Sequence, residues 1–180
     1  MKFQEEILAM VQQVKLPPGE TLPPGIGSDE IDAFSRRTRL HVPPELTEWL
    51  KICNGPCFNP EGTYGIGVSR KILDIESKLK LKPEYLSLGW IPLAGDGCGD
   101  YYLVATKEEY GPGYPVFFID HEIAYDQPRY IVASSIAHFL RFYLEESLGA
   151  YYWPFTKDKV LEKDPDICGF HGIRLPWDAD

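Results

Sequence analysis

The chain has 180 residues, of which 44% are apolar and 25% are charged. This length and balance are typical of one globular domain with its own core, and they argue against disordered, collagen-like and membrane-embedded proteins. A net charge of -9 disfavours direct binding of nucleic acid, because phosphates would be repelled, and it favours the approach of a basic protein.

The first fifteen residues are predicted to form an amphipathic helix. Apolar residues recur there at helical spacing: Phe3, Ile7, Met10, Val11 and Val14. The proline- and glycine-rich stretch that follows, up to Gly27, predicts a rigid connector. Acidic residues stand where a signal peptide would be apolar, and no run is long enough to span a bilayer, so we expect a cytoplasmic protein without a membrane segment.

Two more helices are predicted before residue 57. Ser28 is expected to cap the first, which has acids in its first turn and two arginines near its end, as the helix dipole favours. Pro43 and Pro44 open the second, whose apolar stripe contains Leu46, Trp49, Leu50 and Cys53. The sequence Asn54-Gly55-Pro56 predicts a left-handed cap and a stop.

From Leu86 the pattern changes to that of strands. Leu86, Leu88 and Trp90 alternate, and short β-branched or aromatic runs follow at 101–105, 116–119 and 130–133, which predicts successive antiparallel strands. Ser134 or Ser135 then caps a helix that ends at Gly149 and covers one face of the sheet. The sequence therefore predicts an α+β fold: a small antiparallel sheet of about four to six strands, with helices packed against it.

Three segments organise the chain in this interpretation. Residues 1–27 form the helix and connector, residues 28–148 the central domain, and residues 149–180 an aromatic-rich appendage packed on the same domain. The density of aromatic residues after Gly149 argues against a disordered tail. An exposed aromatic patch for a partner is the alternative.

The run Gly95-Asp96-Gly97-Cys98-Gly99-Asp100 has three interpretations. The favoured one is a hairpin turn in which glycines adopt positive φ and aspartates accept hydrogen bonds from nearby amides. A cation site lacks the spacing of a calcium loop. A nucleophilic Cys98 would need a histidine within reach, and its acidic neighbours disfavour a thiolate. We therefore predict no catalytic residue, no metal and no cofactor. The histidines available to such a thiol are His41, His121, His138 and His171.

The cysteines give no sign of a disulfide framework, because four in a chain of this length are too few and too scattered. They are Cys53, Cys57, Cys98 and Cys168. We expect reduced thiols. Shared zinc lacks a matching second pair at zinc-finger spacing, and core packing explains Cys53 better.

Acidic residues at the predicted strand ends are the candidate partner-binding site. A solvated turn, or acidity that only maintains solubility, is the alternative. Such acids would attract a basic protein and fix its register, while an aromatic side chain would supply affinity. The candidate residues are Asp96, Asp100, Tyr101, Asp120, Glu122 and Asp126.

The order of these segments resembles the SUKH superfamily, also called the Smi/Knr cell-wall-assembly regulator family. The likeness runs from about Ser28 to Leu148. It rests on the segments V-P-P-E-L-T-E-W-L-K-I-C-N-G, W-I-P-L-A-G-D-G-C-G-D-Y and Y-I-V-A-S-S-I-A-H-F-L. The family-motif positions are Pro43, Trp49, Asn54, Gly55, Trp90, Pro92, Gly97 and Gly99.

The resemblance implies a mixed α+β fold and a binding role. Many bacterial relatives are immunity proteins that neutralise polymorphic or contact-dependent toxins, often nucleases, and fungal relatives regulate cell-wall assembly through protein contacts. We therefore expect a protein-binding module, not an enzyme, whose partner is a basic toxin domain and not a nucleic acid or a membrane. A regulatory scaffold is the alternative, and a small cysteine-dependent enzyme is a third class.

Overall fold

The computed structural model describes residues 2–14, 16, 21–55 and 62–179, with side chains from residue 5 onward. The described α-helices are α1 (Lys2–Val11), α2 (Ser28–Thr38), α3 (Pro44–Ile52), α4 (Ile75–Leu81), α5 (Glu84–Leu88), α6 (Ile136–Ser147) and α7 (Lys157–Lys163). The strands are β1 (Gly62–Thr63), β2 (Trp90–Gly95), β3 (Tyr101–Ala105), β4 (Val116–Ile119) and β5 (Tyr130–Ala133). Short 3-10 helices are η1 (Lys71–Leu73), η2 (Pro165–Gly169) and η3 (Pro176–Asp178). None of the described helices has the length and apolarity that a membrane crossing requires.

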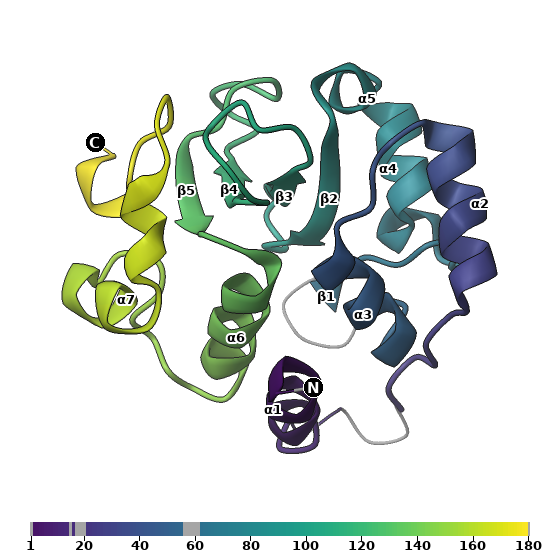
Figure 1. The fold of residues 1–180 in the computed structure, drawn as a ribbon, viewed down its shortest axis with the longest axis horizontal. Coiled ribbons are helices and arrows are strands. Elements are labelled where there is room, and N and C mark those ends of the chain that lie inside the picture. Colours follow the sequence, from purple (N-terminus) through teal and green to yellow (C-terminus); the bar gives the residue numbers. More distant parts are fainter. Residues whose placement is uncertain (1, 15, 17–20, 56–61, 180) are drawn as a thin grey trace.

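The strands form one antiparallel sheet in the order β1-β2-β3-β4-β5, with every neighbour in sequence also a neighbour in space (Figure 1). Trp90 pairs with Ala105, and Phe117 pairs with Ile131. The fold is α+β, and five strands agree with the predicted size of the sheet. The runs predicted at 101–105, 116–119 and 130–133 coincide with β3, β4 and β5.

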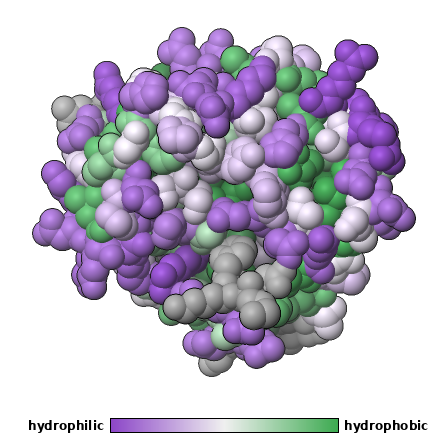
Figure 2. Space-filling model, viewed as in Figure 1, coloured by the Kyte–Doolittle hydropathy of each residue, from purple (hydrophilic) through white to green (hydrophobic). Residues whose placement is uncertain are grey.

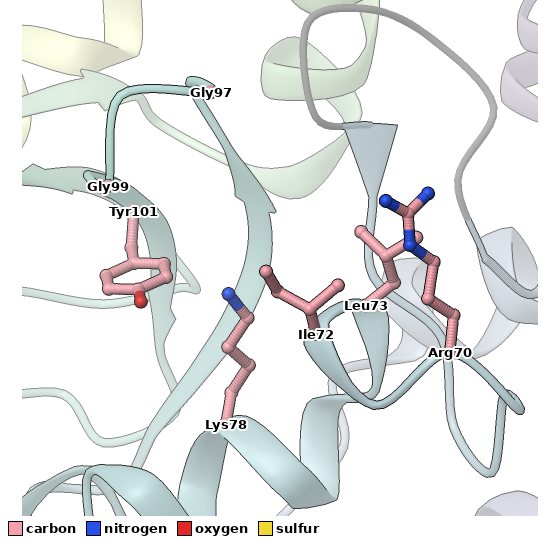
Figure 3. A pocket seen from close by; sticks show the side chains of 7 residues that line it. All are labelled: Arg70, Ile72, Leu73, Lys78, Gly97, Gly99 and Tyr101. Atoms are coloured by element: carbon pink, nitrogen blue, oxygen red, sulfur yellow. The ribbon is translucent and has the colours of Figure 1, made fainter.

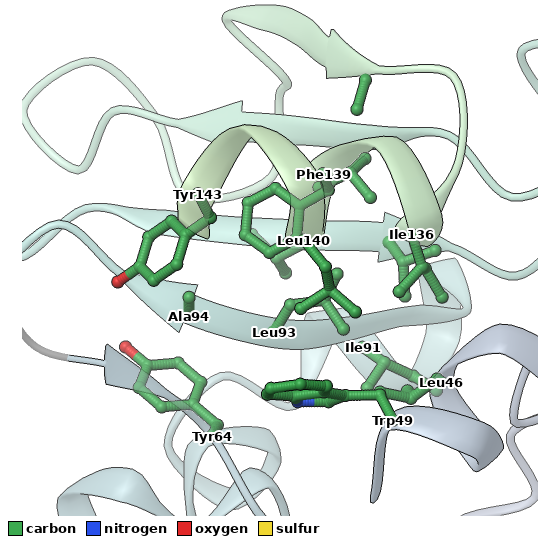
Figure 4. Packing of buried hydrophobic residues seen from close by; sticks show 14 of the residues in the cluster. Leu46, Trp49, Tyr64, Ile91, Leu93, Ala94, Ile136, Phe139, Leu140 and Tyr143 are labelled. Atoms are coloured by element: carbon green, nitrogen blue, oxygen red, sulfur yellow. The ribbon is translucent and has the colours of Figure 1, made fainter. Parts of the chain in front are cut away.

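Helix α6 covers one face of the sheet, as predicted (Figure 4). Its N-cap is Ser135, whose Oγ accepts a hydrogen bond from the His138 backbone N–H at 3.2 Å. Phe139 and Tyr143 point from α6 toward the sheet, and their ring centroids lie 5.3 and 6.0 Å from that of Tyr102 on β3. Trp49 of α3 closes the same core from below in this view.

The opposite face is built around Trp90, which is 1% exposed. Its ring meets Phe117 edge-on at 4.7 Å between centroids and lies 6.0 Å from Tyr85 of α5. The indole N–H donates a hydrogen bond to Glu109 Oε1 at 2.5 Å. The motif tryptophan is therefore a core residue that joins β2, β4, α5 and the loop after β3.

Residues after α6 lie along β5 at the edge of the sheet (Figure 1). The backbone N–H of Ile131 donates to the carbonyl of Arg174 at 2.9 Å, and the Trp153 indole N–H donates to the carbonyl of Val132 at 2.8 Å. On the other side of the molecule, α1 packs against α6 and α3 through its buried residues Ile7 and Val11.

The predicted strand at Leu86 and Leu88 is wrong. Both residues lie in α5, which ends at Gly89 in the left-handed region with φ 79°. In a segment of only five residues, a strand and a single helical turn can have apolar residues at the same positions. The pattern at Leu86 and Leu88 therefore did not distinguish a strand from a helix. The strand begins only at Trp90.

Two predicted caps are also wrong. Ser28 is the first residue of α2, and Gly27 is its N-cap without a side-chain hydrogen bond. Helix α3 ends at an extended Cys53. Asn54 instead uses its side chain to hold another segment: its Oδ1 accepts from the Ile66 N–H at 2.7 Å and its Nδ2 donates to the Ile66 carbonyl at 2.9 Å. Pro56 lies outside the described residues.

The prediction of reduced cysteines holds for only two of the three described residues. Cys98 and Cys168 are free and exposed, whereas Cys53 is part of a disulfide, so the prediction is wrong there. Cys57 lies outside the described residues. Sequence spacing could not settle the matter, because a disulfide depends on backbone geometry that brings two Cα atoms within about 7 Å.

Truncating Trp90 should destabilise the fold strongly. Trp90→Ala removes a large buried side chain and leaves the Glu109 carboxylate without its donor, so we expect a loss of about 3–5 kcal/mol in the free energy of unfolding. Urea denaturation measures this change. Tyr151→Ala is the matched control, because Tyr151 is 87% exposed and its loss should cost within about 0.5 kcal/mol. Equal effects of the two substitutions would contradict the core position of Trp90.

Candidate functional site

The glycine-rich run forms the turn between β2 and β3, which confirms the favoured interpretation. Gly97 and Gly99 have φ values of 84° and 108°, conformations that glycine adopts without steric cost. The Asp96 carboxylate lies inside the turn, where its Oδ1 accepts from the backbone N–H groups of Cys98 at 2.8 Å and Asp100 at 3.1 Å. Asp96 therefore fixes the shape of the turn.

Asp100 connects this turn to the loop between β4 and β5. Its Oδ1 lies 2.8 Å from the backbone N of His121 and 2.6 Å from the ring Nδ1. The hydrogen bond to Asp100 raises the pKa of His121, and the charges of Asp100, Glu122 and Asp120 act in the same direction against the effect of desolvation. The two loops thus meet at a carboxylate–imidazole contact.

Asp120 has a structural role within the β4–β5 loop. One carboxylate oxygen pairs with Arg129 Nη1, and the other accepts from the Glu122 backbone N–H at 3.0 Å. Glu122 and Asp126 are themselves exposed. Of the predicted acids, these two are therefore the ones whose side chains extend from the surface.

Three of the acids raise the pKa of the same buried tyrosine. Burial raises the pKa of Tyr130 to about 12, Arg129 opposes the shift, and the charges of Asp100, Asp120 and Asp96 add to it. Carboxylate oxygens of Asp100 and Asp120 lie within 4.8 Å of each other, so the turn and the loop meet at these two side chains. Burial raises the pKa of Tyr85 in α5, and the charge of Asp126 adds to this shift. We call Asp96, Asp100, Asp120, Glu122 and Asp126 the strand-end acidic site.

Tyr101 faces a separate pocket beside the acidic site (Figure 3). The pocket has a volume of about 380 Å³. Lys78 reaches into it from α4; this side chain is only 5% exposed, and its Nζ lies 4.6 Å from the ring centroid of Tyr101 and 4.7 Å from that of Tyr64. The lining residues are Arg70, Ile72, Leu73, Lys78, Gly97, Gly99 and Tyr101.

Sequence reasoning missed Arg70, Ile72 and Lys78 because β1, η1 and α4 were not predicted. One signal could have located α4: Asp74 stands three residues before Ser77, and its Oδ1 accepts from the Ser77 backbone N–H at 2.8 Å, as an N-cap does. Nothing in the sequence placed α4 beside Tyr101, since that contact depends on the packing of the whole sheet.

Asp100, Asp120 and His121 also form a group of possible metal ligands, with ligand atoms within 4.8 Å of one another. Within this group Asp100 contacts the ring of His121, and Asp120 pairs with Arg129. Among the described residues, no hydrogen bond joins the Cys98 thiol to a histidine, and His121 is engaged by Asp100.

On the face shown in Figure 2, hydrophilic side chains predominate and apolar ones are scattered between them. Exposed apolar side chains near the site include Ile72, 55% exposed beside the pocket, and Ile123 in the β4–β5 loop. Isolated apolar residues in a polar surrounding suit a binding surface with a few anchoring contacts.

Comparison with known proteins gives one match. A family model described as SMI1 / KNR4 family (SUKH-1) matches residues 25–141. This span contains the whole sheet, every family-motif position and all five acids of the strand-end site; α1, the second half of α6 and everything after it lie outside. No curated protein and no solved structure matches the chain.

The contact between Asp100 and His121 predicts a pH dependence. Because the folded-state pKa of His121 is raised above its ordinary value of 6.5, the contact contributes stability that is complete below pH 6.5 and is lost as the pH rises through the raised pKa. Asp100→Asn should return the pKa of His121 toward 6.5, as an NMR titration of the ring protons would show. Glu122→Gln removes a charge that contributes less to raising the pKa of His121, so this substitution should lower that pKa by a smaller amount. A His121 pKa that does not respond to Asp100→Asn would refute the assignment.

Proposed function

Because the chain belongs to the SMI1/KNR4 family (SUKH-1), we propose that it is a protein-binding module and, more specifically, an immunity protein that neutralises a cognate bacterial toxin. Family membership is the observation that carries this proposal, since it supports an immunity or Smi1/Knr4-like role. The strand-end acidic site is the proposed contact surface, and a basic toxin domain is the proposed partner.

The arrangement of the acids supports this proposal. Asp96, Asp100 and Asp120 are held by hydrogen bonds or an ion pair, so the loops that carry Glu122 and Asp126 have a defined backbone. A surface ordered before binding loses less conformational entropy on association. Exposed acids on such a surface would accelerate the approach of a basic partner and set its orientation.

Affinity would come from contacts beside the acids. The pocket at Tyr101 and the exposed side chain of Ile72 offer an apolar surface of the kind on which interface hot spots form, and truncating a hot-spot residue costs roughly 2–4 kcal/mol. If the partner is a nuclease, its arginines and lysines bind phosphate. Carboxylates form similar charge-assisted contacts with these groups, so the acidic site would block the surface that the substrate needs.

A regulatory role like that of the fungal cell-wall regulators is the second candidate, because the matching family model bears their names. Gene order separates the two. A large modular toxin encoded immediately upstream supports immunity, and a toxin domain taken from that gene is the natural probe. The immunity proposal would be overturned if this toxin domain does not bind the chain. It would also be overturned if the chain does not restore growth to cells that produce the toxin domain.

Reversing the two exposed acids should weaken association with that toxin domain. In the variant Glu122→Lys with Asp126→Lys, we expect association about tenfold slower at low salt and a flatter salt dependence, measured by stopped-flow or surface-based kinetics. The melting temperature should stay nearly unchanged, because neither side chain is buried. Asp120 is left intact because it binds Arg129.

The matched control reverses the same charge elsewhere. Glu30→Lys with Asp32→Lys changes two exposed acids on α2, so it alters the net charge equally and leaves the β4–β5 loop untouched. Equal slowing by both variants would assign the effect to overall charge. Unchanged association in the Glu122 and Asp126 variant would exclude the strand-end acidic site as the contact surface.

A further inference from the structure

A second pocket, of about 660 Å³, lies where the start of α6 meets η2. Its walls combine residues inside the family match with residues that follow it. Three come from the α6 N-terminus and three from the segment after α7: Ser134, Ser135, His138, Asp166, Cys168 and Phe170. The pocket is thus a feature of this chain with its C-terminal segment, and it is separate from the strand-end acidic site.

A buried carboxylate lies beside His138, one of the residues that line this pocket. Asp164 is 0% exposed. Its Oδ2 accepts from the Ser134 backbone N–H at 2.7 Å, whereas its Oδ1 accepts no hydrogen bond and lies 3.5 Å from His138 Nδ1. The adjacent Lys163 does not neutralise it, because the Lys163 ammonium binds both oxygens of Glu145 at 2.7 and 2.8 Å. A buried carboxylate with one unsatisfied oxygen is costly unless positive charge lies nearby.

The His138 ring contacts both this carboxylate and the hydroxyls at the start of α6. Its Nδ1 lies 3.2 Å from each of the Ser134 and Ser135 hydroxyl oxygens, besides its approach to Asp164 Oδ1. A carboxylate on one side of an imidazole favours the tautomer with the proton on that side. When the proton is on Nδ1, Nε2 can accept a hydrogen bond from a donor in the pocket that His138 lines.

The remaining lining gives the pocket one sign of charge. Asp166 is the carboxylate of the described lining, which contains no lysine or arginine, and Phe170 with Pro112 and Pro165 provides apolar walls. A carboxylate, the serine hydroxyls and an aromatic ring together suit a cation that carries N–H donors. We propose that this pocket binds an ammonium or guanidinium group carried on an apolar stem.

Cys168 provides a direct measurement of occupancy. It lines the pocket and is a free, exposed thiol, as is Cys98 on the β2–β3 turn. Saturating n-butylguanidinium or n-butylammonium should slow alkylation of Cys168 by iodoacetamide about tenfold, as expected when the ligand occupies most of the sites. Alkylation of Cys98 in the same molecule should stay unchanged, and n-butanol, with the same stem but no charge, should protect neither thiol.

Two variants test the charge requirement. Asp166→Asn should raise the cation concentration needed for half-protection of Cys168 by about threefold, in line with the strength of an exposed ion pair. Asp158→Asn, an exposed acid on α7 outside the lining, should have no effect. Absence of protection by either cation, equal protection by n-butanol, or equal effects of the two variants would overturn the proposal.

The cation could be a free small molecule or a lysine or arginine side chain of a partner protein. Alkylation of the chain in complex with the toxin domain separates these sources. Protection of Cys168 in the complex assigns the pocket to a partner side chain, and continued reactivity together with protection by n-butylguanidinium assigns it to a free cation. Because the cation test uses the chain alone, its failure would leave the proposed toxin binding intact.

Discussion

The contact between the Asp100 carboxylate and His121 is the interaction on which the strand-end surface depends. One oxygen of Asp100 contacts both the backbone N–H and the ring Nδ1 of His121, 21 positions later in the sequence. The β2–β3 turn and the β4–β5 loop are therefore joined at a single carboxylate. Asp96 then orders the turn from within, and Asp120 with Arg129 orders the loop. The exposed acids extend from a loop that these contacts hold in place. Their positions are therefore set by residues whose own carboxylates already have hydrogen-bond or ion-pair partners.

Much of the sheet could be predicted from the sequence, because β3, β4 and β5 are short β-branched and aromatic runs bounded by turn residues. Strand β1, with two residues, carries no such signal and exists only through its pairing with β2. Helix α5 was mistaken for a strand, since Leu86 and Leu88 fit either period over one turn. A helix or strand can be predicted from its local sequence only when it is long enough for the spacing of its apolar residues to be recognised.

The same limit applies to the candidate site. The glycine turn and its aspartates follow from rules that act within five residues, and they were predicted. The proximity of Lys78 to Tyr101, and the hydrogen bond from Ser134 to Asp164 thirty residues later, arise from packing between distant segments. The family-motif positions Trp49 and Trp90 proved to be core residues, and Asn54 holds Ile66. Recurrent sequence features here maintain the scaffold, while the distinctive surface comes from its loops.

The segment after α6 occupies the outer edge of β5 with the chain's own groups, namely the Arg174 carbonyl, the Trp153 indole and the Asp164 carboxylate. An incoming peptide cannot extend the sheet where those backbone positions are already taken. A partner on this side would therefore meet side chains and not the free backbone groups of an edge strand.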